Sequence, residues 1–220
     1  MSTLESIDKE EERVKIEKRK LILAEGKDDF YFFCHACKFY RNVDDVQVMN
    51  FKGIDNLPNF LMLLVNDESY DKVETIVIAR DAETDASAAL ISMQGSVERA
   101  NNKKSANIPK PTKSFAYVQN DSLKTAFMIF PGPQQKKGTL EDLCLLTVED
   151  NLLLECVDGY LKCAKTKGEQ FPRIHKNKLH CFLAGKDNSV GLPVGLAFKA
   201  KVWPPEHPAL EPFKRIIQEM

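Results

Sequence analysis

The stretch Leu21-Ile22-Leu23-Ala24-Glu25-Gly26-Lys27-Asp28-Asp29 decides the fold, because a short apolar run ends abruptly in a glycine and acids. A second stretch repeats the pattern: Ile76-Val77-Ile78-Ala79-Arg80-Asp81-Ala82-Glu83-Thr84-Asp85. Each apolar run has the length of a buried strand and leads into a helix-like segment. In an open parallel sheet, residues just past the carboxyl ends of the strands line the crevice in which ligands bind. We therefore expect Glu25, Asp81 and Glu83 to converge in one small volume.

Such a group of acids predicts a metal site. Crowded carboxylates repel one another unless a cation lies between them, and oxygen ligands suit Mg²⁺ or Mn²⁺. Alternate residues of an extended segment project to the same side, so Asp81 and Glu83 can face one ion. Asp85 is either a third ligand or a helix cap, and the cap is favoured. Asp28 and Asp29 fall in a first helical turn, where the helix dipole alone favours acids.

Strands and helices alternate along the first two thirds of the chain, which predicts an α/β fold with a mainly parallel sheet flanked by helices. The expected strands are Lys20–Ala24, Val46–Phe51, Thr75–Ala79, Phe115–Val118 and Thr125–Phe130. The expected helices are Lys27–Phe39, Gly53–Asn66, Asp85–Ala100, Leu140–Leu146, Val148–Ala164, Arg173–Leu183, Gly191–Lys199 and Pro212–Met220. We divide the chain into a charged arm (1–19), an α/β domain (20–145) and a helical C-terminal extension packed on it (146–220).

The motif Glu25-Gly26-Lys27-Asp28-Asp29 after a strand, followed by Asp81-x-Glu83 after a later strand, resembles the Toprim domain. That domain is shared by topoisomerases, bacterial primases and the OLD (overcoming lysogenization defect) nucleases. The chain is most similar to the small stand-alone Toprim proteins grouped with the OLD-like nucleases, over roughly residues 18 to 145. Glu83 stands where the family motif has a second Asp.

The resemblance implies a Toprim-like Rossmannoid fold and a metal-dependent nuclease that cleaves phosphodiester bonds of DNA or RNA with Mg²⁺ or Mn²⁺. Glu25 would act as a general acid or base or as a metal ligand, and Asp81 and Glu83 would hold the metal. The run Gly138-Thr139-Leu140-Glu141-Asp142 is similar to an acidic segment of the OLD-like proteins that can supply a second metal position, which makes Glu141 a candidate ligand. Thr139 and Asp142 also have the spacing of a capping box, which explains Asp142 without any metal.

Basic side chains near these acids are candidates for phosphate binding. Lys136 and Lys137 precede the acidic run, and Lys176, Lys178, His180 and Lys186 lie on or beside a later helix. A lysine close to a carboxylate–metal site can stabilise the charge of a reacting phosphate. For each of them the alternative is a solvated basic surface. Trp203 followed by two prolines predicts a packed corner that holds the last helix.

The formal net charge of −1 gives no basic excess, so contact with nucleic acid requires a local basic patch. The rival interpretation is therefore a non-catalytic module that binds a nucleotide or nucleic acid within a larger complex. The partner is left open between nucleic acid of either type, a protein and a second copy of the chain. The charged first twenty residues contain no secretory signal and no run reaches the length of a membrane helix, so we expect no membrane partner and a cytoplasmic location.

The six cysteines do not form the pattern of a disulfide framework, and we expect free thiols. Cys34-His35-Ala36-Cys37 could indicate a redox or zinc site, but it falls within a predicted helix and no second cysteine pair lies nearby. Helix packing is the favoured interpretation.

Overall fold

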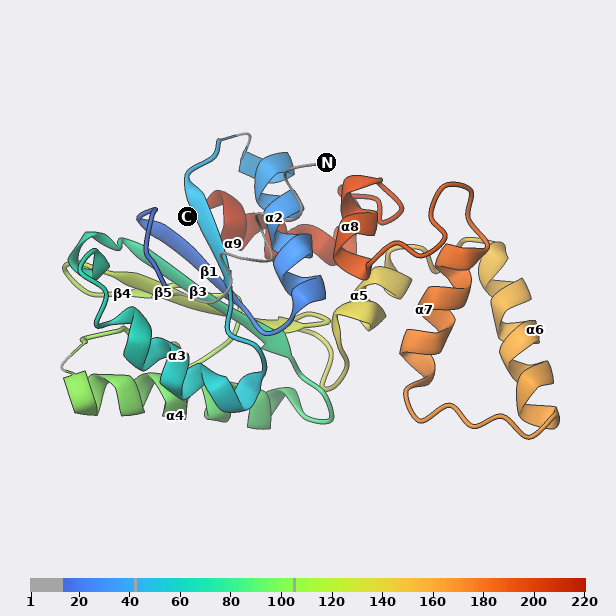
Figure 1. Cartoon of the computed structure of the whole chain (residues 1–220), viewed down its shortest axis with the longest axis horizontal. Coiled ribbons are helices and arrows are strands. Elements are labelled where there is room, and N and C mark those ends of the chain that lie inside the picture. The colour runs from blue at the N-terminus through green and yellow to red at the C-terminus, as the bar shows by residue number, and fades with distance from the viewer. Residues whose placement is uncertain (1–13, 42, 105) are drawn as a thin grey trace.

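The computed structural model describes residues 14–41, 43–104 and 106–220, and a five-stranded sheet lies at its centre (Figure 1). The strands are β1 (Lys20–Ala24), β2 (Val46–Asn50), β3 (Thr75–Asp81), β4 (Val118–Gln119) and β5 (Lys124–Phe130). They lie in the order β2-β1-β3-β5-β4. The first four strands of that order are parallel, and β4 is a short antiparallel edge strand.

Helices cover both faces of the sheet. They are α2 (Lys27–Arg41), α3 (Leu57–Leu64), α4 (Ala86–Lys104), α5 (Leu140–Leu146), α6 (Leu153–Thr166), α7 (Ile174–Ala184), α8 (Val194–Lys199) and α9 (Glu211–Gln218). Three short 3₁₀ turns occupy Ile54–Asn56, Tyr70–Lys72 and Pro208–Leu210. In Figure 1, α3 and α4 lie on one face, whereas α2, α8 and α9 lie on the other. The predicted α/β fold with a mainly parallel sheet is confirmed.

The apolar runs form strands because both of their faces are buried. Alternate residues point to opposite faces of a strand. Ile22 and Ala24 accordingly contact the core under α2 and the C-terminal helices, whereas Leu21 and Leu23 contact the core under α3 and α4. Strands buried on both faces are typical of parallel sheets. Within the part of the chain that the structure describes, no helix has both the length and the apolar character needed to cross a membrane.

The strand order places a topological switch point between β1 and β3. The chain leaves β1 towards α2 on one face and β2 on one side, and it leaves β3 towards α4 on the other face and β5 on the other side. The two connections therefore diverge at the carboxyl ends of the strands, which is where ligands bind in open α/β sheets. Glu25 follows β1 and Asp81 ends β3, so both lie where the connections diverge.

The C-terminal region shares a core with the sheet. The rings of Phe213 in α9 and Phe130 in β5 are stacked with centroids 5.0 Å apart. Trp203 is fully buried and its Nε1 donates to the carbonyl of Val194 at 2.9 Å, so the predicted corner is present. The helices α6 and α7 pack side by side and extend past the end of the sheet (Figure 1).

Two predicted elements differ from the structure. The expected strand Phe115–Val118 is reduced to its last residue, because Phe115 has a φ of 56° and turns its ring into the core against Phe213. The expected helix from Val148 begins only at Leu153, after a series of turns. Most of the predicted arm, residues 1–13, lies outside the described residues. All six cysteines are free thiols, as predicted, and Cys37 is buried in α2.

Candidate functional site

Four carboxyl groups near the switch point influence one another's pKa values, and we call this group the acidic crevice: Glu25, Asp29, Asp81 and Glu141. Oε2 of Glu25 accepts a hydrogen bond from the backbone nitrogen of Asp81 at 3.2 Å. The expectation that these two acids lie at the same end of the sheet is therefore confirmed. Glu25 is mostly buried, and burial raises its pKa although the nearby Arg80 guanidinium lowers it.

Asp29 belongs to the crevice, although the sequence suggested only a favourable position in a helix. Its side chain is buried, and its Oδ2 accepts a hydrogen bond from the backbone nitrogen of Gly26 at 2.9 Å. Burial raises the pKa of Asp29 to about 7, and the negative charges of Glu25 and Glu141 act in the same direction. The tight turn at Gly26 brings the residue three positions later back against Glu25, and this spacing was the available signal.

Asp81 lies at the N-terminus of α5. Its Oδ1 accepts a hydrogen bond from the backbone nitrogen of Leu140 at 2.9 Å, and the predicted capping box of Thr139 and Asp142 opens the same helix. Burial nevertheless raises the pKa of Asp81 to about 9, with further contributions from the neighbouring carboxyl groups of Asp29, Glu141 and Glu25. A carboxyl group in this environment retains its proton at neutral pH unless a cation compensates its charge.

Glu141 faces the same volume from the first turn of α5 and is buried. Nζ of Lys176 in α7 lies 2.9 Å from its Oε1. Burial acts to raise the pKa of Glu141, but hydrogen bonds from Lys176 and Thr139 outweigh it and leave the pKa below its usual value. Of the lysines proposed from the later helix, Lys176 is thus the one that contacts a site acid.

If all four carboxyl groups of the acidic crevice were ionised, their negative charge would exceed the positive charge of the basic side chains paired with them. Nε of Arg80 lies 3.8 Å from Oε2 of Glu25, and Lys176 pairs with Glu141. Two cations thus accompany four carboxyl groups. Among the described residues, no basic side chain is hydrogen-bonded to the carboxyl groups of Asp29 and Asp81. These two groups also have raised pKa values, about 7 for Asp29 and about 9 for Asp81.

Glu83 does not join the buried acids. It has a φ of 53°, and its backbone exchanges two hydrogen bonds of 2.9 Å with Gly138. The backbone is therefore not extended at Glu83. The prediction that Asp81 and Glu83 project to the same side assumed an extended segment, so its basis does not hold there. Its side chain is exposed, yet its charge contributes to raising the pKa of Glu25. The assignment of Glu83 to the same ion as Asp81 rests on sequence alone.

The remaining candidates have simpler surroundings. Oδ1 of Asp85 accepts from the backbone nitrogen of Ser87 at 2.8 Å, in agreement with the helix cap. Lys136 and Lys137 are exposed on the turn between β5 and α5. That turn adjoins the crevice, since the carbonyl of Lys136 accepts from the nitrogen of Ala86 at 2.8 Å. Lys186 packs over the ring of Phe182, with 5.7 Å from its Nζ to the centroid.

The donor atoms of the acidic crevice are all carboxylate oxygens, which fits Mg²⁺ or Mn²⁺ better than softer metals. Across residues 14–41, 43–104 and 106–220, no three His, Cys, Asp or Glu side chains are arranged as a preformed metal centre. Mg²⁺ does not require such a centre, because it commonly binds through one or two carboxylates, water and the phosphate of a substrate.

Comparison with known proteins places the chain in a family. No curated protein and no solved structure matches it. Residues 19–220 match the family model described as "Protein of unknown function (DUF3226)". That match spans the sheet, the acidic crevice and the C-terminal helices, and the chain therefore belongs to the DUF3226 family.

Proposed function

We propose that this protein is a Toprim-like, metal-dependent nuclease that hydrolyses phosphodiester bonds. One observation carries the proposal: Glu25 and Asp81 are hydrogen-bonded neighbours at the topological switch point, within a group of four carboxyl groups of which Glu25 is paired with Arg80 and Glu141 with Lys176. A cation that enters between these groups would replace the protons that Asp81 and Asp29 otherwise retain and compensate their charge. The motif resemblance at Glu25 and Asp81 supports the same reaction class.

Asp81 and Asp29 are the residues that would hold the metal, because their carboxyl groups accept from backbone nitrogens and no salt bridge joins them to a basic side chain among the described residues. When bound, a divalent cation would neutralise the phosphate and stabilise the leaving oxygen. Glu83 and Glu141 remain candidate additional ligands. Glu141 is already paired with Lys176, so its first role is to hold that lysine beside the crevice.

Glu25 is the candidate for proton transfer. Burial raises its pKa above the usual value, which suits a group that takes a proton from a nucleophile or returns one to a leaving group. The hydrogen bond from the nitrogen of Asp81 orients Oε2 of Glu25. The ammonium group of Lys176, together with Lys136 and Lys137 on the adjoining turn, offers positive charge for phosphate oxygens.

A second function is favoured by a different observation. The exposed side chain of Glu83 makes no hydrogen bond or ion pair with the residues that the structure describes, and the crevice lacks a preformed three-ligand centre there. A crevice of this kind could bind a nucleotide or a nucleic-acid end without cleaving it, as part of a larger complex. The two functions differ in their dependence on metal.

The deciding experiment uses single-stranded DNA, duplex DNA and structured RNA with Mg²⁺, Mn²⁺ or EDTA. We expect cleavage only with metal, and we expect its loss in Glu25→Gln and Asp81→Asn. Asp158→Asn is the matched control, because Asp158 is exposed on α6 and its loss should leave cleavage unchanged. Binding in EDTA without cleavage under any condition would establish the non-catalytic function instead. Cleavage that persists in both site variants would assign the activity to another site or to a contaminant.

A further inference from the structure

Helix α6 is apolar on two opposite faces, and only one of them is buried. Leu154, Val157 and Leu161 on the inner face belong to the core. The outer face of α6 is exposed to solvent although it is largely apolar, and it consists of Leu152, Cys156, Gly159, Tyr160 and Cys163. The two largest of these, Leu152 and Tyr160, are 77% and 60% exposed. Because a surface helix normally presents polar side chains to water, the outer face of α6 is a candidate contact surface.

The spacing of the outer face matches that of a seam between two helices. Leu152, which immediately precedes α6, is followed at intervals of four, three and four residues by Cys156, Gly159 and Cys163. Alternating intervals of three and four place side chains in the single stripe along which two helices pack in a coiled coil. Cysteine and glycine are short, which allows the axis of a second helix to come close. The outer face therefore fits another α-helix.

The charges beside this stripe indicate which helix that is. Glu155 and Lys162 are seven residues apart and flank the stripe on one side. Both are exposed, and neither has a hydrogen bond or ion pair with another residue in the part of the chain that the structure describes. Farther from the stripe, Asp158 and Lys165 repeat the order of an acid before a base. An antiparallel copy of α6 would set each acidic half against a basic half, whereas a parallel copy would align halves of like charge.

The place of α6 in the fold leaves its outer face accessible. In Figure 1, α6 is at the edge of the molecule, and α7 lies between it and the sheet. A second copy can therefore approach α6 without meeting the sheet. The helix has 14 residues, and at 1.5 Å per residue a helix of this size is about 21 Å long. A contact of this length lies at the small end of specific interfaces, so we expect reversible association that depends on concentration.

We infer that α6 is the surface through which two copies of this chain associate, with the two helices antiparallel and related by a two-fold axis. Such a contact is isologous, so the same residues serve on both sides. Cys156 of one copy then packs against Gly159 of the other, and Leu152 packs against Cys163. The inference goes beyond the proposed function, because none of the four acids of the acidic crevice lies on α6.

This register brings the unpaired charges together. With Cys156 opposite Gly159, Glu155 of one copy is displaced by two residues, or about 3 Å along the axis, from Lys162 of the other. The two-fold axis creates this pair twice. Both side chains are long enough to bridge the displacement, and each gains a partner that it lacks within the described part of its own chain.

Sedimentation velocity of the full chain under reducing conditions, over about a hundredfold range of concentration, should show a shift from monomer to dimer. Glu155→Lys should weaken the dimer about tenfold, because symmetry turns two attractive pairs into two repulsive ones. Lys162→Glu should do the same. The double variant Glu155→Lys/Lys162→Glu exchanges the charges and should restore the affinity of the wild type. Lys103→Glu is the matched control and should have no effect, because Lys103 is exposed at the C-terminal end of α4, across the molecule from α6 (Figure 1).

A chain that stays monomeric at every concentration would overturn the inference and leave the outer face of α6 to a different protein. A double variant that associates no more tightly than the single variants would overturn the antiparallel pairing. Equal weakening by Lys103→Glu would overturn it as well, because the effect would then come from net charge.

Crosslinking tests the register without changing any charge. Cys156 and Cys163 are exposed thiols. In the proposed dimer the two copies of Cys156 are about 4.5 Å apart along the helix axis, and those of Cys163 are about 16.5 Å apart. A short bismaleimide should therefore crosslink the wild type and Cys163→Ser but not Cys156→Ser. Crosslinking that survives in Cys156→Ser would overturn this arrangement, and so would its loss in Cys163→Ser.

Discussion

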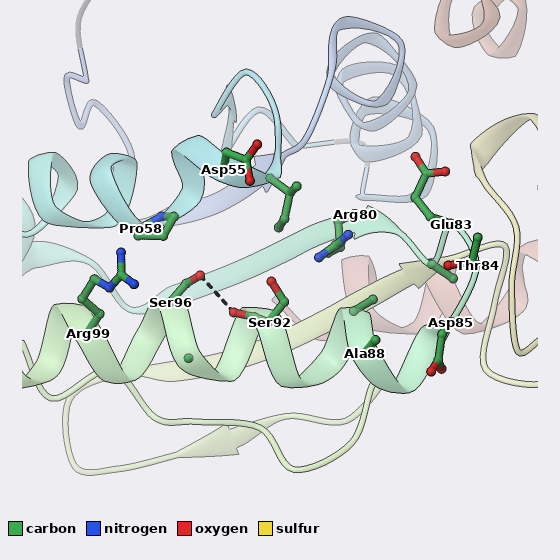
Figure 2. A pocket seen from close by; sticks show the side chains of 14 residues that line it. Asp55, Pro58, Arg80, Glu83, Thr84, Asp85, Ala88, Ser92, Ser96 and Arg99 are labelled. Atoms are coloured by element: carbon green, nitrogen blue, oxygen red, sulfur yellow. Dashed lines mark hydrogen bonds between the residues drawn. The ribbon is translucent and has the colours of Figure 1, made fainter.

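Oε2 of Glu25 and the backbone nitrogen of Asp81 are joined by a hydrogen bond of 3.2 Å across the ends of two neighbouring parallel strands. This bond links the two connections that diverge to opposite faces of the sheet. Asp81 faces α5 on one side of the sheet, and Arg80 faces α3 and α4 on the other, where it lines the pocket drawn in Figure 2. Glu25 contacts both residues, since its Oε2 also lies 3.8 Å from Nε of Arg80.

The acidic crevice should make stability depend on pH. The pKa values of Asp29 and Asp81 are raised to about 7 and about 9, against about 3.9 in an unfolded chain. Between pH 4 and pH 9 the folded protein therefore binds more protons than the unfolded one, and the free energy of unfolding falls as the pH rises. The slope is at most about 1.4 kcal/mol per pH unit for each retained proton. Urea unfolding in EDTA from pH 5 to 9 measures it.

Asp81→Asn should flatten this slope and raise the thermal midpoint at pH 8. Asp81, with its pKa raised to about 9, must take up a proton on folding at that pH, whereas asparagine need not, and its amide oxygen can still accept from Leu140. Mg²⁺ should also raise the midpoint of the wild type at pH 8 and have a smaller effect on the variant. The exposed Asp158→Asn is the control and should follow the wild type. A slope that is identical in Asp81→Asn and the wild type would show that the crevice is not the source.

The lysine pair on α7 provides a second prediction. Lys176 is paired with Glu141, whose side chain is 6% exposed, whereas Lys178 is paired with Asp158, whose side chain is 57% exposed. Lys176→Met leaves a carboxylate buried without its cation and should lower the free energy of unfolding by about 1–2 kcal/mol, less than for a fully buried pair because the lysine is partly exposed. Lys178→Met should change it by less than about 0.5 kcal/mol. Urea denaturation at pH 7 compares the two.

The double variant Lys176→Met/Glu141→Gln separates charge from packing. If the unpaired charge of Glu141 causes the loss, replacing that carboxylate with an amide should restore most of the stability. A double variant no more stable than Lys176→Met would assign the loss to contacts of the lysine side chain.

Some positions in the candidate site could be predicted from the sequence, because a short motif was enough to place the residue at the correct end of a strand or helix. Glu25 and Asp81 follow apolar runs, and the ends of parallel strands meet at one edge, so their neighbourhood followed from two short motifs. The capping box of Thr139 and Asp142 is also local, and it starts α5 as expected. At these residues the structure agrees with the local sequence pattern.

Other site residues depend on the fold in ways that no local pattern contains. The helix dipole alone accounts for an acid at Asp29, so its spacing from Gly26 did not reveal that this side chain is buried near Glu25 and Glu141. Arg80 stood within an apolar strand, and only the positions of α3 and α4 show what it faces. Glu83 and Phe115 adopt positive φ although neither is glycine, which changed the direction of a predicted ligand and shortened a predicted strand.

The packing of α8 on α2 gives the last prediction, because it couples the C-terminal region to the site. A Cβ at Gly195 would lie 2.2 Å from the carbonyl oxygen of Asp28 and 2.5 Å from the nitrogen of Phe32. These are backbone atoms that cannot rotate away, so Gly195→Ala must separate α8 from α2 and should cost about 2–3 kcal/mol. Gly159→Ala in α6 meets nothing within 4 Å and should instead stabilise the protein by about 0.5–1 kcal/mol.

Because α2 begins just after Glu25 and carries Asp29, the same separation should disturb the acidic crevice. We expect Gly195→Ala to reduce the rise in thermal midpoint that Mg²⁺ produces, and Gly159→Ala to leave that rise unchanged. Differential scanning fluorimetry with Mg²⁺ and with EDTA measures both effects in one experiment. A Gly195→Ala variant with the stability and metal response of the wild type would mean that α8 can shift without moving α2, and the C-terminal region would then be independent of the site.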